Sequence, residues 1–191
     1  MSGVLVNERM ENIFYSVIGK HAGESVEEII GRKMKEVSDC GFSLWSAKID
    51  EMSVNQVHAL DKSDKVYVLC RVNKKANDPA KGEVCVATKM IGPNKEEKII
   101  PEGVKSTYGE GKKYQAYVVK DYRILDEPCD FDFGKYETTM KGDTKASFKE
   151  RFNCRQFQNT FGKLNEQLDE TISKDISVVM ELEYPFVVNI K

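Results

Sequence analysis

The stretch that decides the fold runs from Ile13 to Ile49 and reads IFYSVIG (13–19), KHAGES (20–25), VEEIIGRKMKEVSDC (26–40) and GFSLWSAKI (41–49). Its aromatic and β-branched opening, Ile13 to Ile18, predicts a strand. A basic, glycine-bearing loop follows, and apolar residues at helical spacing beyond it predict an amphipathic helix. Phe42 to Ile49 returns as a second strand. We therefore expect a strand–helix–strand unit near the start of the chain.

The helix has a recognisable beginning and end. Ser25 and Glu28 match the capping-box pattern, in which each side chain accepts a hydrogen bond from the other residue's backbone N–H. Cys40-Gly41 ends the helix, because glycine readily adopts the left-handed turn. The predicted buried face holds five apolar residues: Val26, Ile29, Ile30, Met34 and Val37. The predicted solvent face holds four charged residues: Glu27, Arg32, Lys33 and Lys35.

The loop before this helix is the first candidate binding site. Free N–H groups and the positive end of the helix dipole favour an anion at a helix N-terminus. Lys20 offers a point charge, His21 a hydrogen bond or a proton, and Ser25 the cap of the helix. The alternative is a connection whose glycines only permit the turn. The loop matches neither the P-loop nor the dinucleotide-binding pattern.

Aromatic residues on the strands form the second candidate. Trp45, the only tryptophan, shares a strand face with Ser43 and Ala47, the composition of a base-stacking floor. Tyr67 would add a wall. Arg71 shares the strand face of Tyr67 and belongs to a basic middle region that would attract phosphates. For each residue the alternative is ordinary packing or a solvated surface.

Composition limits the class of protein. The 191 residues fit one domain, 1–191, with residues 126–191 as a C-terminal elaboration. No apolar run reaches the roughly 20 residues that span a bilayer. Five scattered cysteines without a C-x-x-C pair indicate reduced thiols in a cytoplasmic protein, and two histidines are too few for a histidine-rich metal site. We expect no membrane partner, no metal and no cofactor.

Charge is unevenly distributed along the chain. Residues 65–125 carry thirteen Lys or Arg against seven Asp or Glu, a balance of +6. Because the whole chain has a net charge of −2, the remainder sums to −8. Such a basic middle region is typical either of a surface that attracts phosphates or of a solvated exterior.

The remaining pattern predicts an α+β fold. Strands are expected at Lys65–Val72, Glu83–Ile91, Lys112–Leu125 and Tyr136–Met140. Ile176–Ile190 is expected to be a strand pair or a bent strand, with an edge or bulge at Pro185. Helices are expected at Ser53–Leu60 and along the spaced phenylalanines from Phe148 to Leu168. The other segments are expected to be a loop (73–82), a flap (95–111) and a break (126–134). A strongly twisted, partly closed mixed sheet with two or three helices would bury so many strands.

The order of these elements resembles the PUA-like superfamily, which includes the EVE, ASCH and YTH domains. The resemblance covers about residues 13–125 and includes Val66-Tyr67-Val68-Leu69, Val84-Cys85-Val86-Ala87-Thr88 and Tyr117-Val118-Val119-Lys120. Ser63-Asp64 stands where those domains often have Gly-Asp. The resemblance implies a pseudo-barrel that holds a nucleobase in an aromatic cleft, and it favours Trp45 as a cleft residue.

These observations favour a non-enzymatic binding module for a phosphorylated or nucleobase-containing ligand. The ligand would be nucleic acid or a free nucleotide, and nucleotide sequestration fits equally well. One alternative is a small hydrolase or transferase that uses His21 as its general base. The other is a protein-interaction or assembly domain, such as a homo-oligomer, with an apolar patch from the C-terminal phenylalanines.

Overall fold

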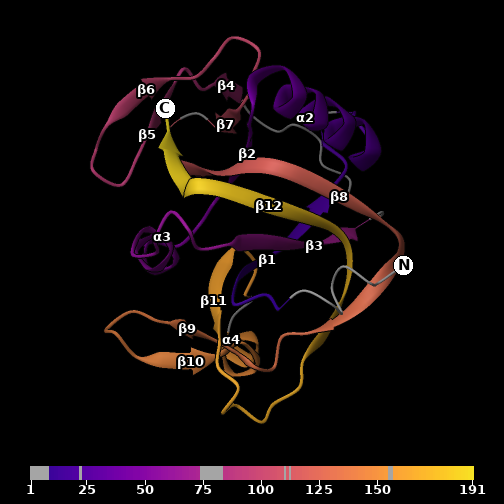
Figure 1. Cartoon of the computed structure of the whole chain (residues 1–191), viewed down its shortest axis with the longest axis vertical. Helices are drawn as coiled ribbons and strands as arrows, with labels where there is room; N and C mark the ends of the chain where they lie inside the picture. Colours follow the sequence, from indigo (N-terminus) through magenta and orange to yellow (C-terminus); the bar gives the residue numbers. More distant parts are fainter. Residues whose placement is uncertain (1–8, 22, 74–83, 110, 112, 155–156) are drawn as a thin grey trace.

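The computed structural model describes residues 9–21, 23–73, 84–109, 111, 113–154 and 157–191, and this part of the chain has an α+β fold (Figure 1). Three helices are present there: α2 (Val26–Cys40), α3 (Glu51–His58) and α4 (Phe148–Cys154). The main sheet contains β1 (Asn12–Gly19), β2 (Ser43–Ala47), β3 (Val66–Asn73), β5 (Lys89–Ile91), β6 (Glu97–Ile99), β8 (Tyr114–Asp132), β9 (Tyr136–Thr139), β10 (Lys145–Ser147), β11 (Thr160–Leu164) and β12 (Ser173–Ile190). A second, two-stranded sheet joins β4 (Val84–Val86) to β7 (Thr107–Gly109).

The main sheet is mostly antiparallel and open. Its order is β10-β9-β11-β1-β3-β12-β5-β6, and β8 pairs with both β12 and β2. Among the paired strands described, only β1 and β3 run parallel, and the crossover connection that this requires contains α2, β2 and α3. The end strands β10 and β6 do not pair with each other, so the predicted closure toward a pseudo-barrel is wrong for the described residues. The α+β class is confirmed, and the three helices present agree in number with the predicted two or three.

Two long strands connect the ends of the molecule. In Figure 1, β8 and β12 run side by side between α2 at one end and the group of β9, β10, β11 and α4 at the other. The strand β12 also pairs with β3, so the predicted C-terminal elaboration (126–191) supplies a strand between β3 and β8. The predicted break at 126–134 is wrong, because β8 continues to Asp132 by pairing with β12 from Asp132↔Ser173 onward.

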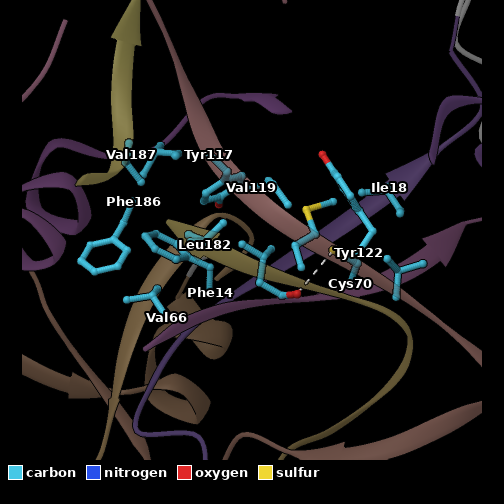
Figure 2. Close-up of a cluster of buried hydrophobic side chains, with 14 of the residues drawn as sticks. Phe14, Ile18, Val66, Cys70, Tyr117, Val119, Tyr122, Leu182, Phe186 and Val187 are labelled. Carbon is cyan, nitrogen blue, oxygen red and sulfur yellow. Dashed lines mark hydrogen bonds between the residues drawn. The ribbon is translucent and has the colours of Figure 1, made fainter. Parts of the chain in front are cut away.

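The central strand β3 is buried on both faces. Val66, Val68 and Cys70 pack beneath α2 and α3 with Phe14, Tyr117 and other residues of the cluster that Figure 2 shows. On the opposite face, Tyr67 and Leu69 join a second cluster, which contains Ile13, Tyr15, Phe133, Phe148 and Phe157. A strand with this burial alternates between two cores rather than between core and solvent.

The phenylalanine series does not form one long helix. Only α4 is helical, and the chain then reverses into β11, so the predicted helix from 148 to 168 is wrong. Phe148 stacks on Phe157 with ring centroids 4.9 Å apart. Gly162 permits this packing, because a Cβ there would lie 2.4 Å from Cζ of Phe148. The four-residue spacing therefore reflects aromatic packing across a chain reversal.

Two further segments differ from their predictions. The expected strand 83–91 is divided between β4 and β5, which belong to different sheets. The expected flap 95–111 instead contains β6 and β7. The predicted loop at 73–82 lies outside the described residues, apart from Asn73 at the end of β3. Other element positions agree, including β9 and the irregular pairing near Pro185.

The helix α2 begins and ends as predicted but differs in its buried face. The capping box between Ser25 and Glu28 is present, and Gly41 at the C-cap has a φ of 88°. Met34, predicted to be buried, is 45% exposed. Lys33, predicted to face solvent, is buried with Glu36. The charged residues Lys33 and Glu36 therefore pack against other parts of the protein. The spacing of the apolar residues alone does not predict that burial.

Candidate functional site

The predicted anion-binding loop lies at the surface between β1 and α2. Lys20 and His21 are exposed, and His21 pairs with Glu24 through two backbone hydrogen bonds of 3.1 and 2.8 Å. Ser25 Oγ accepts from the N–H of Glu28 (3.2 Å), and a Glu28 carboxylate oxygen accepts from the N–H of Ser25 (2.8 Å). The helix start therefore already holds a carboxylate of its own chain, where a bound anion was predicted.

An ion pair lies beside this loop. The Arg32 guanidinium donates two hydrogen bonds to the Glu24 carboxylate, at 3.3 and 3.0 Å. These bonds lower the pKa of Glu24. Glu24 remains negative at neutral pH and neutralises Arg32, and the Glu28 carboxylate adds a negative charge at the helix start to the positive charge that Lys20 brings to the loop.

Trp45 lies on β2 and is half-buried. Its strand-face partners are as predicted, since Trp45 and Ala47 pack against the cluster beneath α2 and α3. The indole packs on the Tyr122 ring with centroids 6.2 Å apart and tilted by 52°. The Tyr122 hydroxyl lies 2.5 Å from Ser43 Oγ, and burial raises the pKa of Tyr122 above its usual range. Trp45 thus belongs largely to the core.

Tyr67 and Arg71 lie on the other face of the sheet. Tyr67 is 4% exposed and packs in the second cluster. Arg71 is exposed and interacts with the Tyr15 hydroxyl of the same cluster; burial raises the pKa of Tyr15, and Arg71 opposes that shift. The structure therefore keeps Lys20, His21 and Ser25 in one loop, but places Trp45 and Tyr67 on opposite faces.

A groove of about 340 Å³ lies elsewhere, against β5, β6 and the end of β12. We call it the β12 groove. Its apolar lining comes from four separate strands or loops: Phe42, Met90, Val118 and Val188. Its remaining lining consists of four charged residues, one aromatic residue, a glycine and a proline: Lys62, Glu96, Lys98, Glu183, Tyr184, Gly92 and Pro185. None of the predicted site residues lines it.

An irregularity in β12 forms one wall of this groove. Leu182 pairs with Val119 and Val187 with Tyr117, so four residues of β12 (183–186) oppose the single residue Val118. This bulge leaves Tyr184 37% exposed at the groove, whereas Phe186 is 1% exposed in the core. Figure 2 shows Phe186 beside Val187 in that cluster. The bulge thus turns one aromatic ring inward and presents the other to the groove.

Local contacts hold the bulge in place. Phe186 has a φ of 71°, a left-handed conformation that is strained for an aromatic residue and persists only where packing enforces it. His58, at the end of α3, has Nε2 2.6 Å from the carbonyl oxygen of Val187. The Tyr184 ring meets the Phe186 ring edge-on, with centroids 5.6 Å apart. Tyr184 is therefore presented from an anchored backbone.

Some charged side chains around the groove have interaction partners within the protein and others do not. Lys62 Nζ lies 5.8 Å from the centroid of the Tyr184 ring. Glu96 accepts a 2.8 Å hydrogen bond from the N–H of Asn94 and lies against Gly92, where a Cβ would come within 2.0 Å of its carboxylate. Within the described ranges, the side chains of Lys98 and Glu183 have no hydrogen-bond or ion-pair partner. One positive and one negative side chain, Lys98 and Glu183, therefore lie unpaired within the described part of the chain, beside the apolar lining of the groove.

Sequence reasoning missed this groove for a simple reason. Its lining residues are scattered over 42–188, and no local spacing connects them. The one usable signal was Pro185, whose missing N–H predicts an edge or bulge in a strand. That signal locates the irregularity but not the residues opposite it.

The comparisons add no assignment. Comparison of the chain with protein-family models, curated proteins and solved structures gave no significant match. The PUA-like resemblance therefore stays a prediction. In the described part of the chain, no helix is both long and apolar enough to cross a bilayer. No cluster of three or more metal-ligating side chains occurs among those residues.

Proposed function

We propose that this chain is a non-enzymatic binding protein for a nucleotide, and that the nucleotide occupies the β12 groove rather than the loop at 19–25. The observation that carries the proposal is the exposed Tyr184 ring beside an apolar floor and two lysines, Lys62 and Lys98. A volume of 340 Å³ lies within the range of small-molecule sites, about 300–1,000 Å³.

Each part of a nucleotide has a complementary group there. A base stacks on an aromatic ring, a contact worth roughly 1–3 kcal/mol per base. Lys62 Nζ already lies 5.8 Å from the centroid of the Tyr184 ring, so a stacked base would displace this ammonium group from the ring. Met90, Val118 and Val188 would cover the second side of the base, and the lysines would neutralise a phosphate.

The groove favours a free nucleotide over a long strand. Its lysines lie at one small site, whereas binding of a nucleic acid strand requires a positively charged path that follows the backbone. The loop at 19–25, in which Lys20 and His21 are exposed, remains the alternative site, with these two residues in the roles that the sequence predicts.

Isothermal titration calorimetry with nucleoside monophosphates and a short single-stranded oligonucleotide tests the proposal at two salt concentrations. We expect binding of the monophosphate with a shallow salt dependence, and its loss in Tyr184→Ala. Tyr114→Ala is the matched control, because Lys48 lies 5.4 Å from that ring centroid but neither residue lines the groove.

Three results would contradict the proposal. Wild-type protein that binds no nucleotide refutes it outright. Binding that survives Tyr184→Ala but is lost in a Lys20→Ala/His21→Ala variant moves the site to the loop. A nucleotide that is chemically converted during incubation, with conversion lost in His21→Ala, makes the protein an enzyme.

The protein-interaction alternative has lost the patch on which it was based. Phe148, Phe157 and Phe161 are buried in the core, and Phe152 is the one described member of the series with substantial exposure (43%). Lys174 Nζ lies 4.4 Å from the Phe152 ring centroid, so part of that ring is covered.

A further inference from the structure

We infer that the β12 groove selects guanine among the bases, and that Glu183 is the residue that makes the selection. This inference rests on the proposed function. It adds a base preference to the nucleotide class, and it assigns a role to a carboxylate that the stacking and phosphate contacts do not use.

The position of Glu183 carries the inference. It directly precedes Tyr184 in the bulge, and both residues line the groove. Recognition by Glu183 requires that a base stacked on Tyr184 turns its polar edge toward this part of the rim. Glu183 is exposed and, within the described ranges, has no partner of its own. The second carboxylate of the groove, Glu96, is already held by the N–H of Asn94.

The chemistry of an ionised carboxylate decides which base edge it recognises. Its two oxygens only accept hydrogen bonds, and they suit a pair of adjacent donors. Guanine presents such a pair, N1–H and the 2-amino group, on one edge. Adenine places the acceptor N1 beside its amino donor, and cytosine likewise places N3 beside its amino donor. Against either edge, one carboxylate oxygen would face a lone pair.

The rest of the groove supports the same choice. Phe42, Val118 and Val188 offer apolar side chains, so they leave the base edge without competing polar partners. Lys62 and Lys98 carry only donors, which suit guanine O6 or a phosphate oxygen. Among the residues that the structure describes, Glu183 is therefore the carboxylate of the groove whose side chain has no hydrogen-bond or ion-pair partner.

Calorimetric titration of wild type and Glu183→Gln with GMP, IMP and AMP tests the inference. Wild type should bind GMP about tenfold or more tightly than AMP, the discrimination that one good bidentate contact provides. IMP lacks the 2-amino donor and should fall between the two. Glutamine offers one acceptor and one donor, so Glu183→Gln should lose the preference for GMP while keeping its affinity for AMP.

Glu96→Gln is the control on the same rim and should keep the preference for GMP. Tyr184→Ala tests nucleotide binding itself and should lose affinity for all three nucleotides. Equal wild-type affinities for GMP and AMP, or an unchanged preference in Glu183→Gln, overturn the selection by Glu183 and leave nucleotide binding intact. If Glu96→Gln loses the preference for GMP and Glu183→Gln keeps it, Glu96 is the selecting carboxylate and the inference about Glu183 is wrong. Wild type that binds none of the three nucleotides refutes the proposed function itself. Thermal unfolding midpoints close to wild type establish that each variant is folded.

Discussion

Replacement of Lys33 by methionine removes the charged residue that joins α2 to two other segments. Lys33 Nζ donates to the carbonyl oxygens of Leu44 (2.7 Å) and Lys105 (2.6 Å), and to a carboxylate oxygen of Glu36 (3.2 Å). Glu36 also accepts from the N–H of Lys105 (3.0 Å). Lys33 and Glu36 are 6% and 5% exposed. Burial lowers the pKa of Lys33, and Glu36 opposes that shift.

The cost follows from what the substitution leaves behind. Lys33→Met leaves the buried Glu36 carboxylate with only the more distant Arg32 guanidinium (3.8 Å) as a cationic neighbour, and it removes the lysine donor from two carbonyl groups. Removing one partner of a buried ion pair costs about 3–5 kcal/mol. For a chain of 191 residues, each kcal/mol lowers the melting temperature by about 2–4 °C, so we expect a loss of roughly 6–20 °C.

Urea unfolding followed by circular dichroism measures the loss in the free energy of unfolding, and thermal unfolding followed in the same way measures the fall in melting temperature. Lys35→Met is the matched control, because the Lys35–Asp39 pair lies on the same helix with both side chains largely exposed, and we expect no measurable change there. The double variant Lys33→Met/Glu36→Leu removes both charges but still leaves three backbone groups of Leu44 and Lys105 unpaired. It should therefore recover only part of the loss. A Lys33→Met protein as stable as the control would refute the reasoning.

Three further outcomes follow from the structure. Gly162→Ala should destabilise the protein by about 1–3 kcal/mol, because the added Cβ would overlap the Phe148 ring. Gly31→Ala should stabilise it by roughly 0.5–1 kcal/mol, because Gly31 lies in α2 with open space around it. Urea unfolding of both variants measures these changes. Burial raises the pKa of Cys70, Tyr117, Tyr122 and Tyr136, so their contribution to stability should be complete below about pH 9 and fall as pH rises, since the unfolded state ionises first. An unfolding free energy that stays constant through this alkaline range would contradict that assignment. Ser25→Ala should cost about 1 kcal/mol through loss of the cap and leave nucleotide affinity unchanged; a matching loss of affinity would return the site to the loop.

The sequence by itself determined the parts of the fold that depend on near neighbours in the chain. The capping box of α2, its glycine C-cap and the strand faces around Trp45 all follow from contacts within a few residues. The limits of β1 and β9 follow from local composition in the same way. These features need no information about the rest of the chain.

The tertiary structure alone decided which faces meet. Lys33 is buried because Leu44 and Lys105 supply its acceptors, and neither is within one helical turn of it. The strand β8 passes the predicted break because β12 pairs with it there. Tyr67 and Trp45 were expected to cooperate, yet β3 is covered on both sides and the sheet separates them.

The β12 groove is the clearest example of a feature that local sequence patterns do not predict. Pro185 indicates an irregular strand, but the wall that presents Tyr184 exists only because four residues of β12 oppose Val118 on β8. Register between distant strands depends on the packing of both, and each side chain contributes only a small part of that free energy. Local patterns therefore determine the elements whose stabilising contacts are local, such as α2, whereas long-range packing determines elements such as the end of β8 and the groove itself.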